Sequence, residues 1–258
     1  MKKVGLALGG GGVRGTAHIA YLEAMEQCGI KPQIISGTSA GAIVGALYAG
    51  GFNPQDILGL LGGFLGKERR RILPLMRKRK NGGLIAAFAR DYFERILPKK
   101  RFEELDIPLK IVTTNFHTLE EKVFEHGDIL PALMGSIAFP NVFIPQYVQG
   151  EYYMDGGATN IVPFDIIRSS CDVLIAIDVS LVRSNQFSLS TKNALRATWA
   201  ATHETLISAK QKQTPVEIFE RPSFSKAATM EFHKYKMVYQ QAQEYKDAFI
   251  EKLKKNVI

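Results

Sequence analysis

The two stretches VGLALGGGGVRG (4–15) and IISGTSAG (34–41) decide the fold of this chain, because each joins a short apolar run to a tight glycine turn. Apolar residues with helical spacing follow both turns: Ile19, Leu22 and Met25, then Ile43, Val44, Leu47 and Tyr48. A strand, a tight turn and a helix therefore occur twice in succession. This order predicts a layered α/β fold in which the strands form a largely parallel central sheet.

The rest of the chain continues the alternation of strands and helices. We expect further strands at 109–116 (LKIVTTNF), 122–126 (KVFEH), 151–155 (EYYMD) and 173–180 (VLIAIDVS). The first and last of these are apolar runs rich in β-branched residues, which is typical of strands covered on both faces. Amphipathic helices are predicted at 84–97 and near the end of the chain, where one face carries Val238, Ala242, Tyr245, Phe249 and Leu253.

The composition fits one catalytic-sized domain. Hydrophobic residues make up 46% of the 258 residues, which is enough to build a full core. The two cysteines, Cys28 and Cys171, exclude a disulfide-stapled scaffold and fit a reducing compartment. The N-terminal apolar run lacks the features of a signal peptide, and residues 34–52 are too rich in Gly, Ser and Thr for a membrane span. We therefore predict a cytoplasmic protein, and peripheral association with the inner face of the membrane stays open.

The positive charge of the chain is concentrated in one segment. The net charge is +8, from 33 Lys and Arg against 25 Asp and Glu. Residues 67–101 hold 13 basic and three acidic residues, whereas the remainder holds 20 basic and 22 acidic residues and is nearly neutral. Within that segment, KERRRILPLMRKRK (67–80) carries eight positive charges and one negative charge. The excess charge is therefore a local feature.

The glycine run before the first helix satisfies G-x-G-x-x-G, the fingerprint of a dinucleotide site, when it is read from Gly10 to Gly15. That site also requires an acidic residue about 20 residues later, whereas the sequence there is PQIIS (32–36). A phosphate-binding Walker loop requires a lysine after its final glycine, where this chain has Thr16. The remaining interpretation is a set of backbone N–H groups that turn toward one point before a helix, as in an anion hole.

Ser39 lies at the centre of a G-x-S-x-G sequence between a strand and a helix, the context that a nucleophile elbow requires. The glycines on either side allow the strand and the helix to approach closely while the serine projects from a sharp turn. The positive end of the helix dipole favours the alkoxide as it forms. We therefore predict Ser39 as a nucleophile.

The sequence leaves two candidates open for the group that accepts the proton of Ser39. Asp178 and His203 follow Ser39 in the order that an α/β-hydrolase triad uses, although His203 lies in a helix-like stretch where histidines are more often structural. Asp155 is the other candidate, because it stands in an Asp-Gly-Gly sequence directly after a predicted strand. That sequence is, taken alone, a turn signature.

Three motifs in order resemble the patatin-like phospholipase family: GGGVRG (10–15), GTSAG (37–41) and DGG (155–157), with SIAFP (136–140) before the last. The similarity runs from about residue 4 to residue 180. It implies a serine acyl hydrolase on a three-layer α/β/α sandwich with a mostly parallel central sheet. We expect a single hydrolase domain over residues 1–258, with a basic insert at about 67–101 that borders the active site. No cluster of metal ligands is seen, and we infer neither a metal nor another cofactor.

Carried over motif by motif, the resemblance implies a dyad without histidine, in which Ser39 is the nucleophile and Asp155 the general base. The N–H groups of the oxyanion hole would come from Gly10, Gly11 and Gly12. Arg14 would orient the glycine loop, with a contact to a lipid phosphate as a second option. The supporting motif positions are Gly15, Gly37, Gly41, Gly156 and Gly157.

The expected substrate is a lipid or phospholipid ester. The family commonly inserts variable elements between the nucleophile and the strand at 109–116, which is where the basic segment lies. An anionic membrane surface is therefore predicted to contact Arg69, Arg70, Arg71, Arg77, Lys78, Arg79 and Lys80. Nucleic acid is disfavoured because the segment lacks exposed aromatic residues interleaved with its charges for base stacking, and a solvated charged loop is the alternative. The other function class that stays open is a membrane-associated regulatory or binding protein on the same fold, with little or no turnover.

Overall fold

A computed structural model describes residues 2–64, 82–180, 189–224 and 227–257 of the chain. Its centre is a sheet to which these residues contribute eight strands. The strands are β1 (Val4–Leu8), β2 (Ile34–Thr38), β3 (Leu109–Asn115), β4 (Glu121–Phe124), β5 (Gln146–Val148), β6 (Glu151–Asp155), β7 (Val173–Ile177) and β8 (Ile218–Glu220). Strands β3, β2, β1, β7 and β8 are neighbours in this order and run parallel. Strands β4 and β6 pair antiparallel with β3, and β5 pairs with β6. The mostly parallel sheet confirms the predicted fold class.

The central strands are buried on both faces, as their continuous apolar sequences predict. Side chains alternate across a strand, so that Leu6 and Leu8 of β1 join the larger core cluster. Ala7 points to the opposite face and joins a smaller cluster with Leu174 and Ala176 of β7. Two separate hydrophobic cores, one on each face, therefore hold the sheet between two layers.

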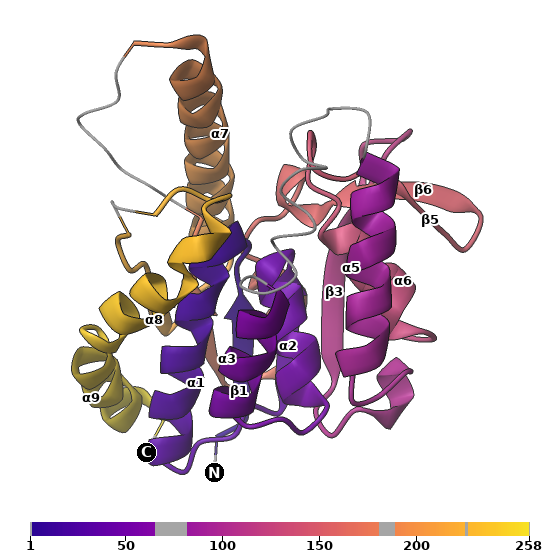
Figure 1. The fold of residues 1–258 in the computed structure, drawn as a ribbon. Helices are drawn as coiled ribbons and strands as arrows, with labels where there is room; N and C mark the ends of the chain where they lie inside the picture. The colour runs from indigo at the N-terminus through magenta and orange to yellow at the C-terminus, as the bar shows by residue number, and fades with distance from the viewer. Residues whose placement is uncertain (1, 65–81, 181–188, 225–226, 258) are drawn as a thin grey trace.

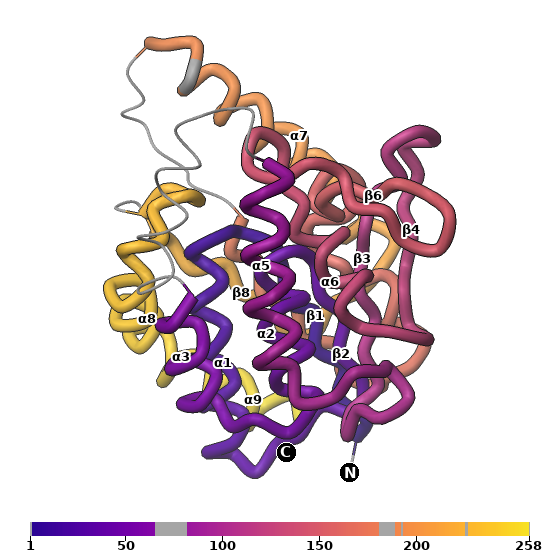
Figure 2. The backbone as a smooth tube through the Cα atoms, turned by 45° about the vertical axis from the view of Figure 1, so that its right-hand side comes forward, coloured from indigo at the N-terminus to yellow at the C-terminus, as the bar shows by residue number. Residues whose placement is uncertain are grey.

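The helices form these two layers. They are α1 (His18–Gln27), α2 (Ala40–Ala49), α3 (Pro54–Gly62), α5 (Gly82–Ile96), α6 (Ile129–Ser136), α7 (Thr191–Gln213), α8 (Tyr235–Gln243) and α9 (Lys246–Asn256). Helices α1, α2, α3 and α5 stand together on the side of the larger core (Figure 1). The smaller core is closed by the segment around the 3-10 helix η5 (Asp165–Ser170) and by Ile207 of α7. This is the predicted three-layer arrangement. The first turns of α7 extend beyond the end of the sheet in both views (Figures 1 and 2). None of the helices in the described ranges is long and apolar enough to cross a membrane.

Two predicted helices differ in detail. The closing helix is divided, because Glu244 and Tyr245 donate their N–H groups to carbonyls three residues earlier, at 3.2 and 3.1 Å, instead of four. The change of direction allows both Ala242 of α8 and Phe249 of α9 to be buried. The first predicted helix, α1, does not follow the glycine turn directly, because residues Gly12–Ala17 form a 3-10 helix, η1, before it begins at His18. Strands β5 and β8 and helices α3 and α6 were not predicted, because short or partly apolar segments carry a weak periodic signal.

Candidate active site

The order of strand pairing places Ser39 beside Asp155. Strand β2 pairs with the first part of β3 and ends with Thr38 opposite Val112. Strand β6 pairs with the next part of β3, with Asp155 opposite Thr113. Strand β4 pairs with both Val112 and Thr113 and so occupies one edge of β3. Strands β2 and β6 therefore lie one after the other along the opposite edge. Their carboxyl ends therefore meet, and the residues at those ends become neighbours.

Ser39 has the backbone geometry of a nucleophile elbow. Its φ of 53° and ψ of −118° lie in a region that residues other than glycine rarely adopt. Its carbonyl accepts hydrogen bonds from Ala42 and Ile43 at 3.0 and 3.2 Å, which starts α2. Gly41 is required for this close turn, because a Cβ at this position would collide with the carbonyl oxygen of Leu8 in β1. The strain at Ser39 is thus held by the packing of α2 against the sheet.

Asp155 accepts a hydrogen bond from the hydroxyl of Ser39, with 2.8 Å between Oγ and Oδ2. Its other carboxylate oxygen accepts the N–H of Gly157 at 2.8 Å. The side chain is buried, and burial raises the pKa of Asp155 from 3.8 to about 6, while the hydrogen bonds from Gly157 and Ser39 lower it. A carboxylate with this pKa is a better proton acceptor near neutral pH than an exposed aspartate.

The glycine loop approaches the same point. Gly10 packs against Ser39, since a Cβ on Gly10 would lie 3.2 Å from the Cβ of Ser39. The N–H of Gly10 is donated to the carbonyl of Ile161 at 2.8 Å. Within the described parts of the chain, no hydrogen bond engages the N–H groups of Gly11 and Gly12. Gly12 has a φ of 60° and lies against the carbonyl of Thr229, which leaves no room for a side chain. Of the three predicted oxyanion donors, Gly11 and Gly12 are therefore the two whose N–H groups have no acceptor among the described residues.

Arg14 holds the glycine loop in place. Its Nε donates to the carbonyl of Val179 at 2.8 Å, and its Nη2 donates to Ser180 at 2.6 Å and to Thr229 at 3.1 Å. The side chain is only 3% exposed, and burial lowers its pKa to about 10. These contacts suit the predicted loop-orienting role. They leave the guanidinium too buried for the contact with a lipid phosphate that was the second option.

The other motif glycines lie where chain segments touch. A Cβ at any of them would meet backbone atoms or a neighbouring side chain: Gly15 meets Ala40, Gly37 meets Gly41 and Ala42, Gly156 meets Val112, and Gly157 meets Ile161. The glycines therefore allow the three motifs to pack directly around Ser39.

The alternative triad is not assembled in the structure. The Nε2 of His203 donates to the carbonyl of Gly157 at 2.9 Å, and burial lowers the pKa of this imidazole. Asp178 is fully buried, and its Oδ1 accepts hydrogen bonds from the N–H and hydroxyl of Ser180 at 2.8 and 2.6 Å. Arg221 Nε lies 2.9 Å from its Oδ2. His203 therefore supports the loop after Asp155, and Asp178 belongs to a separate ion pair with Arg221.

Ser136 is a further site residue, for which no role was predicted from the sequence. Its Oγ accepts the backbone N–H of Ser39 at 2.8 Å. The SIAFP motif was the available signal, but a contact between residues 97 positions apart cannot be read from one sequence.

The predicted membrane-contact residues Arg69, Arg70, Arg71, Arg77, Lys78, Arg79 and Lys80 lie outside the described residues.

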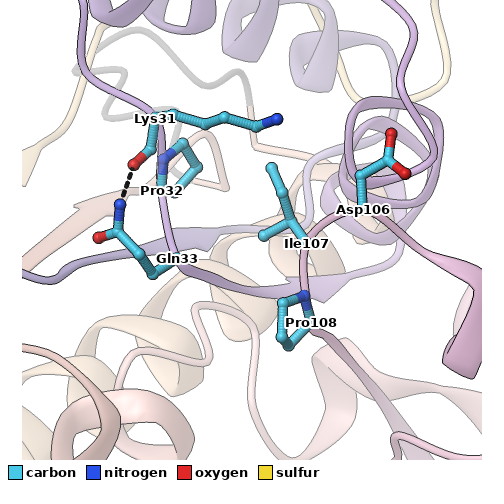
Figure 3. Close-up of a pocket in the computed structure, with 6 residues that line it drawn as sticks. All are labelled: Lys31, Pro32, Gln33, Asp106, Ile107 and Pro108. Carbon is cyan, nitrogen blue, oxygen red and sulfur yellow. Dashed lines mark hydrogen bonds between the residues drawn. The ribbon is translucent and has the colours of Figure 1, made fainter.

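A surface cavity lies at the other end of the sheet. It has a volume of about 280 Å³ and is lined by Lys31, Pro32, Gln33, Asp106, Ile107 and Pro108 (Figure 3). These residues come just before β2 and β3, whereas Ser39 comes just after β2. The cavity is therefore separated from Ser39 and Asp155 by the length of a strand.

Comparisons with known proteins point to one family. The sequence model of the patatin-like phospholipases matches residues 6–168. Lysophospholipase NTE1 of Pyricularia oryzae is 28% identical over 282 aligned positions, which cover 98% of this chain and 19% of the relative. Lysophospholipase nte1 of Aspergillus fumigatus is 27% identical over 284 positions, which cover 98% and 18%. The chain thus spans about a fifth of the length of these curated relatives. The crystal structure of VipD from Legionella pneumophila matches with a TM-score of 0.54 at 12% identity, over 97% of this chain and 66% of VipD, which indicates a shared fold.

Proposed function

Because the chain belongs to the patatin-like phospholipase family, we propose that it is a lipid acyl hydrolase with Ser39 as its nucleophile and Asp155 as its general base. One observation carries the proposal: the hydroxyl of a strained serine donates to a buried carboxylate at 2.8 Å. Nucleophile and base within hydrogen-bond reach are the signature of covalent catalysis. The curated relatives are named as lysophospholipases, so we propose a lysophospholipid as the substrate.

The acylation step uses the contacts around Ser39. Its Oγ attacks the ester carbonyl carbon while its proton passes to Oδ2 of Asp155. The carbonyl π electrons move to oxygen, and the resulting oxyanion accepts the N–H groups of Gly11 and Gly12. Each well-aligned donor lowers the barrier by about 3 kcal/mol. Asp155 then returns the proton to the leaving alkoxide as the ester C–O bond breaks, which leaves an acyl group on Ser39.

The deacylation step reverses these roles with water as the nucleophile. Asp155 removes a proton from the water as its oxygen attacks the acyl carbon. The same N–H groups stabilise the second oxyanion. Its collapse breaks the bond to Ser39 Oγ, which regains its proton from Asp155. The products are a free fatty acid and the alcohol, and the dyad is restored.

A fluorophosphonate ester probe tests this proposal directly, because it reacts with activated serine hydroxyls. We expect the protein to be labelled and the label to be found on a peptide that contains Ser39. The Ser39→Ala variant should remain unlabelled. A native protein that is not labelled would instead favour the membrane-associated binding protein with little or no turnover.

The rate of hydrolysis should depend on pH through Asp155. The base form is the carboxylate, so kcat/KM is expected to rise tenfold per pH unit below the pKa and to level off above about pH 6. A pH–rate profile of the free enzyme between pH 4.5 and 8, on an uncharged ester, measures this limb. A profile that is flat across this range would contradict the assignment of Asp155 as the base.

We also propose that the basic segment 67–80 binds an anionic lipid surface. Its net charge of +7, from eight basic residues and one acid, provides up to about 1 kcal/mol of attraction per basic residue at low salt. Cosedimentation with phosphatidylserine vesicles should be strong at low salt and weak at high salt. Replacing Arg69, Arg70, Arg71, Arg77, Lys78, Arg79 and Lys80 by Gln should abolish it. Vesicles of phosphatidylcholine alone are the control, and binding that survives the substitutions would refute the proposal.

A further inference from the structure

We propose that the turn at the end of α6, through Ser136 and Ala138, positions both members of the dyad relative to each other. The inference rests on the proposed function of Ser39 and Asp155. The turn contains the SIAFP sequence, for which the catalytic steps above have no role. It acts through the backbones of the two dyad residues, so Ser136 is a positioning residue and does not touch the reacting atoms.

The first contact fixes the nucleophile. Ser39 follows the last paired residue of β2 and precedes the first residue of α2, so its N–H has no place in either regular element. The Oγ of Ser136 accepts this N–H at 2.8 Å. Ser136 is fully buried, so water cannot replace it as the acceptor. Without this oxygen the N–H of the strained elbow would lose its acceptor.

The second contact fixes the base. The backbone N–H of Asp155 donates to the carbonyl of Ala138 at 3.1 Å. Asp155 is the last residue of β6, and the chain turns sharply after it into Gly156. The bond to Ala138 therefore holds the end of β6 at the point where the carboxylate leaves the strand.

The turn between these contacts is itself closed by hydrogen bonds between residues two or three positions apart. The N–H of Ala138 donates to Gly135 at 3.1 Å, and the N–H of Phe139 donates to Ile137 at 2.7 Å. Ser136 and Ala138 are two positions apart, whereas the residues they hold are 116 positions apart. One compact turn thus sets the relative position of Ser39 and Asp155. A displacement of about 1 Å between reacting groups can lower a rate by about 100-fold.

Replacement of Ser136 by alanine tests the inference, with Ser36→Ala as the matched control. Ser36 is also fully buried, and its hydroxyl donates to the carbonyl of Pro163 at 2.7 Å on the same strand that leads to Ser39. We expect Ser136→Ala to lower kcat by roughly 10- to 100-fold with little change in KM. Ser36→Ala should keep kcat within about twofold of the native value. An unchanged kcat in Ser136→Ala, or an equal loss in Ser36→Ala, would overturn the inference.

Hydrogen–deuterium exchange separates this inference from the proposed function, because it needs no turnover. A peptide containing Ser39 should exchange faster in Ser136→Ala than in the native protein or in Ser36→Ala. Unchanged exchange would overturn the inference even if the enzyme is active. Faster exchange in a protein that the fluorophosphonate probe does not label would support the positioning contact and reject the hydrolase. If Ser136→Ala does not fold, Ser136→Cys replaces it, because the thiol keeps a weak acceptor. This variant should give an exchange rate and a kcat between those expected for Ser136→Ala and those of the native protein. Native values of both would refute the inference.

Discussion

Ser39→Ala is expected to lower kcat for ester hydrolysis by about 10⁶-fold, to the level supported by substrate binding and oxyanion donors alone. The substitution removes the only atom of this residue that can form the acyl-enzyme. The backbone of the elbow is held by the Ser136 contact and by the start of α2, neither of which uses the Ser39 hydroxyl. The fold should therefore survive, which circular dichroism can check beside the rate measurement.

Ser39→Gly is the matched variant for the strain at the elbow. Both variants lack the hydroxyl, but glycine adopts a φ of 53° and ψ of −118° without the cost of about 1–3 kcal/mol that another residue incurs. We therefore expect both variants to be inactive and Ser39→Gly to have the higher Tm, by about 2–4 °C per kcal/mol. Equal Tm values would mean that the elbow stores no strain. Hydrolysis by either variant would exclude Ser39 as the nucleophile.

Asp155→Asn is expected to lower kcat by roughly 10³- to 10⁴-fold, because the amide keeps the shape of the side chain but cannot take the proton of Ser39. His203→Ala should reduce kcat by less than about tenfold, since the imidazole contacts the carbonyl of Gly157 and not Ser39. The triad of Ser39, Asp178 and His203 makes the opposite prediction. A collapse of the rate in His203→Ala with near-native activity in Asp155→Asn would refute the dyad.

Asp155→Asn should also change how the stability of the protein depends on pH. The pKa of Asp155 is about 6 in the folded protein and 3.8 when exposed, so the native state binds the proton more tightly. Stability is therefore lost as pH rises between these values, and the buried carboxylate destabilises the fold by about 3 kcal/mol above pH 6. Asparagine does not ionise. We expect Asp155→Asn to gain more Tm over the native protein at pH 8 than at pH 4.5, and an equal difference at both would contradict the raised pKa.

Much of the fold and part of the site could be predicted from local patterns. The run Val4–Leu8 and the sequence VLIAI (173–177) are parallel, fully buried strands, as their continuous apolar character predicts. The prediction of a single closing helix was only partly correct, because the chain divides into α8 and α9 at Glu244 and Tyr245, whose N–H groups bond to carbonyls three residues earlier. The prediction of three oxyanion donors also could not be checked from the sequence. The N–H of Gly10 is donated to the carbonyl of Ile161, about 150 positions away, and this contact is visible only in the tertiary structure.

The sequence by itself determined the local chemistry: a glycine loop without side chains, a serine on a strand-to-helix elbow, and an aspartate before a glycine turn. These features depend on neighbouring residues, so they can be read from short motifs. The residues alone left both Asp155 and His203 open as partners of Ser39, and the family resemblance implied Asp155. Only the tertiary structure brings the Asp155 carboxylate within hydrogen-bond distance of the Ser39 hydroxyl. The reason is that β2 and β6 occupy successive parts of one edge of β3, and this register depends on pairings between residues far apart in the chain. The burial that raises the pKa of Asp155 and the contact from Ser136 arise from the same packing.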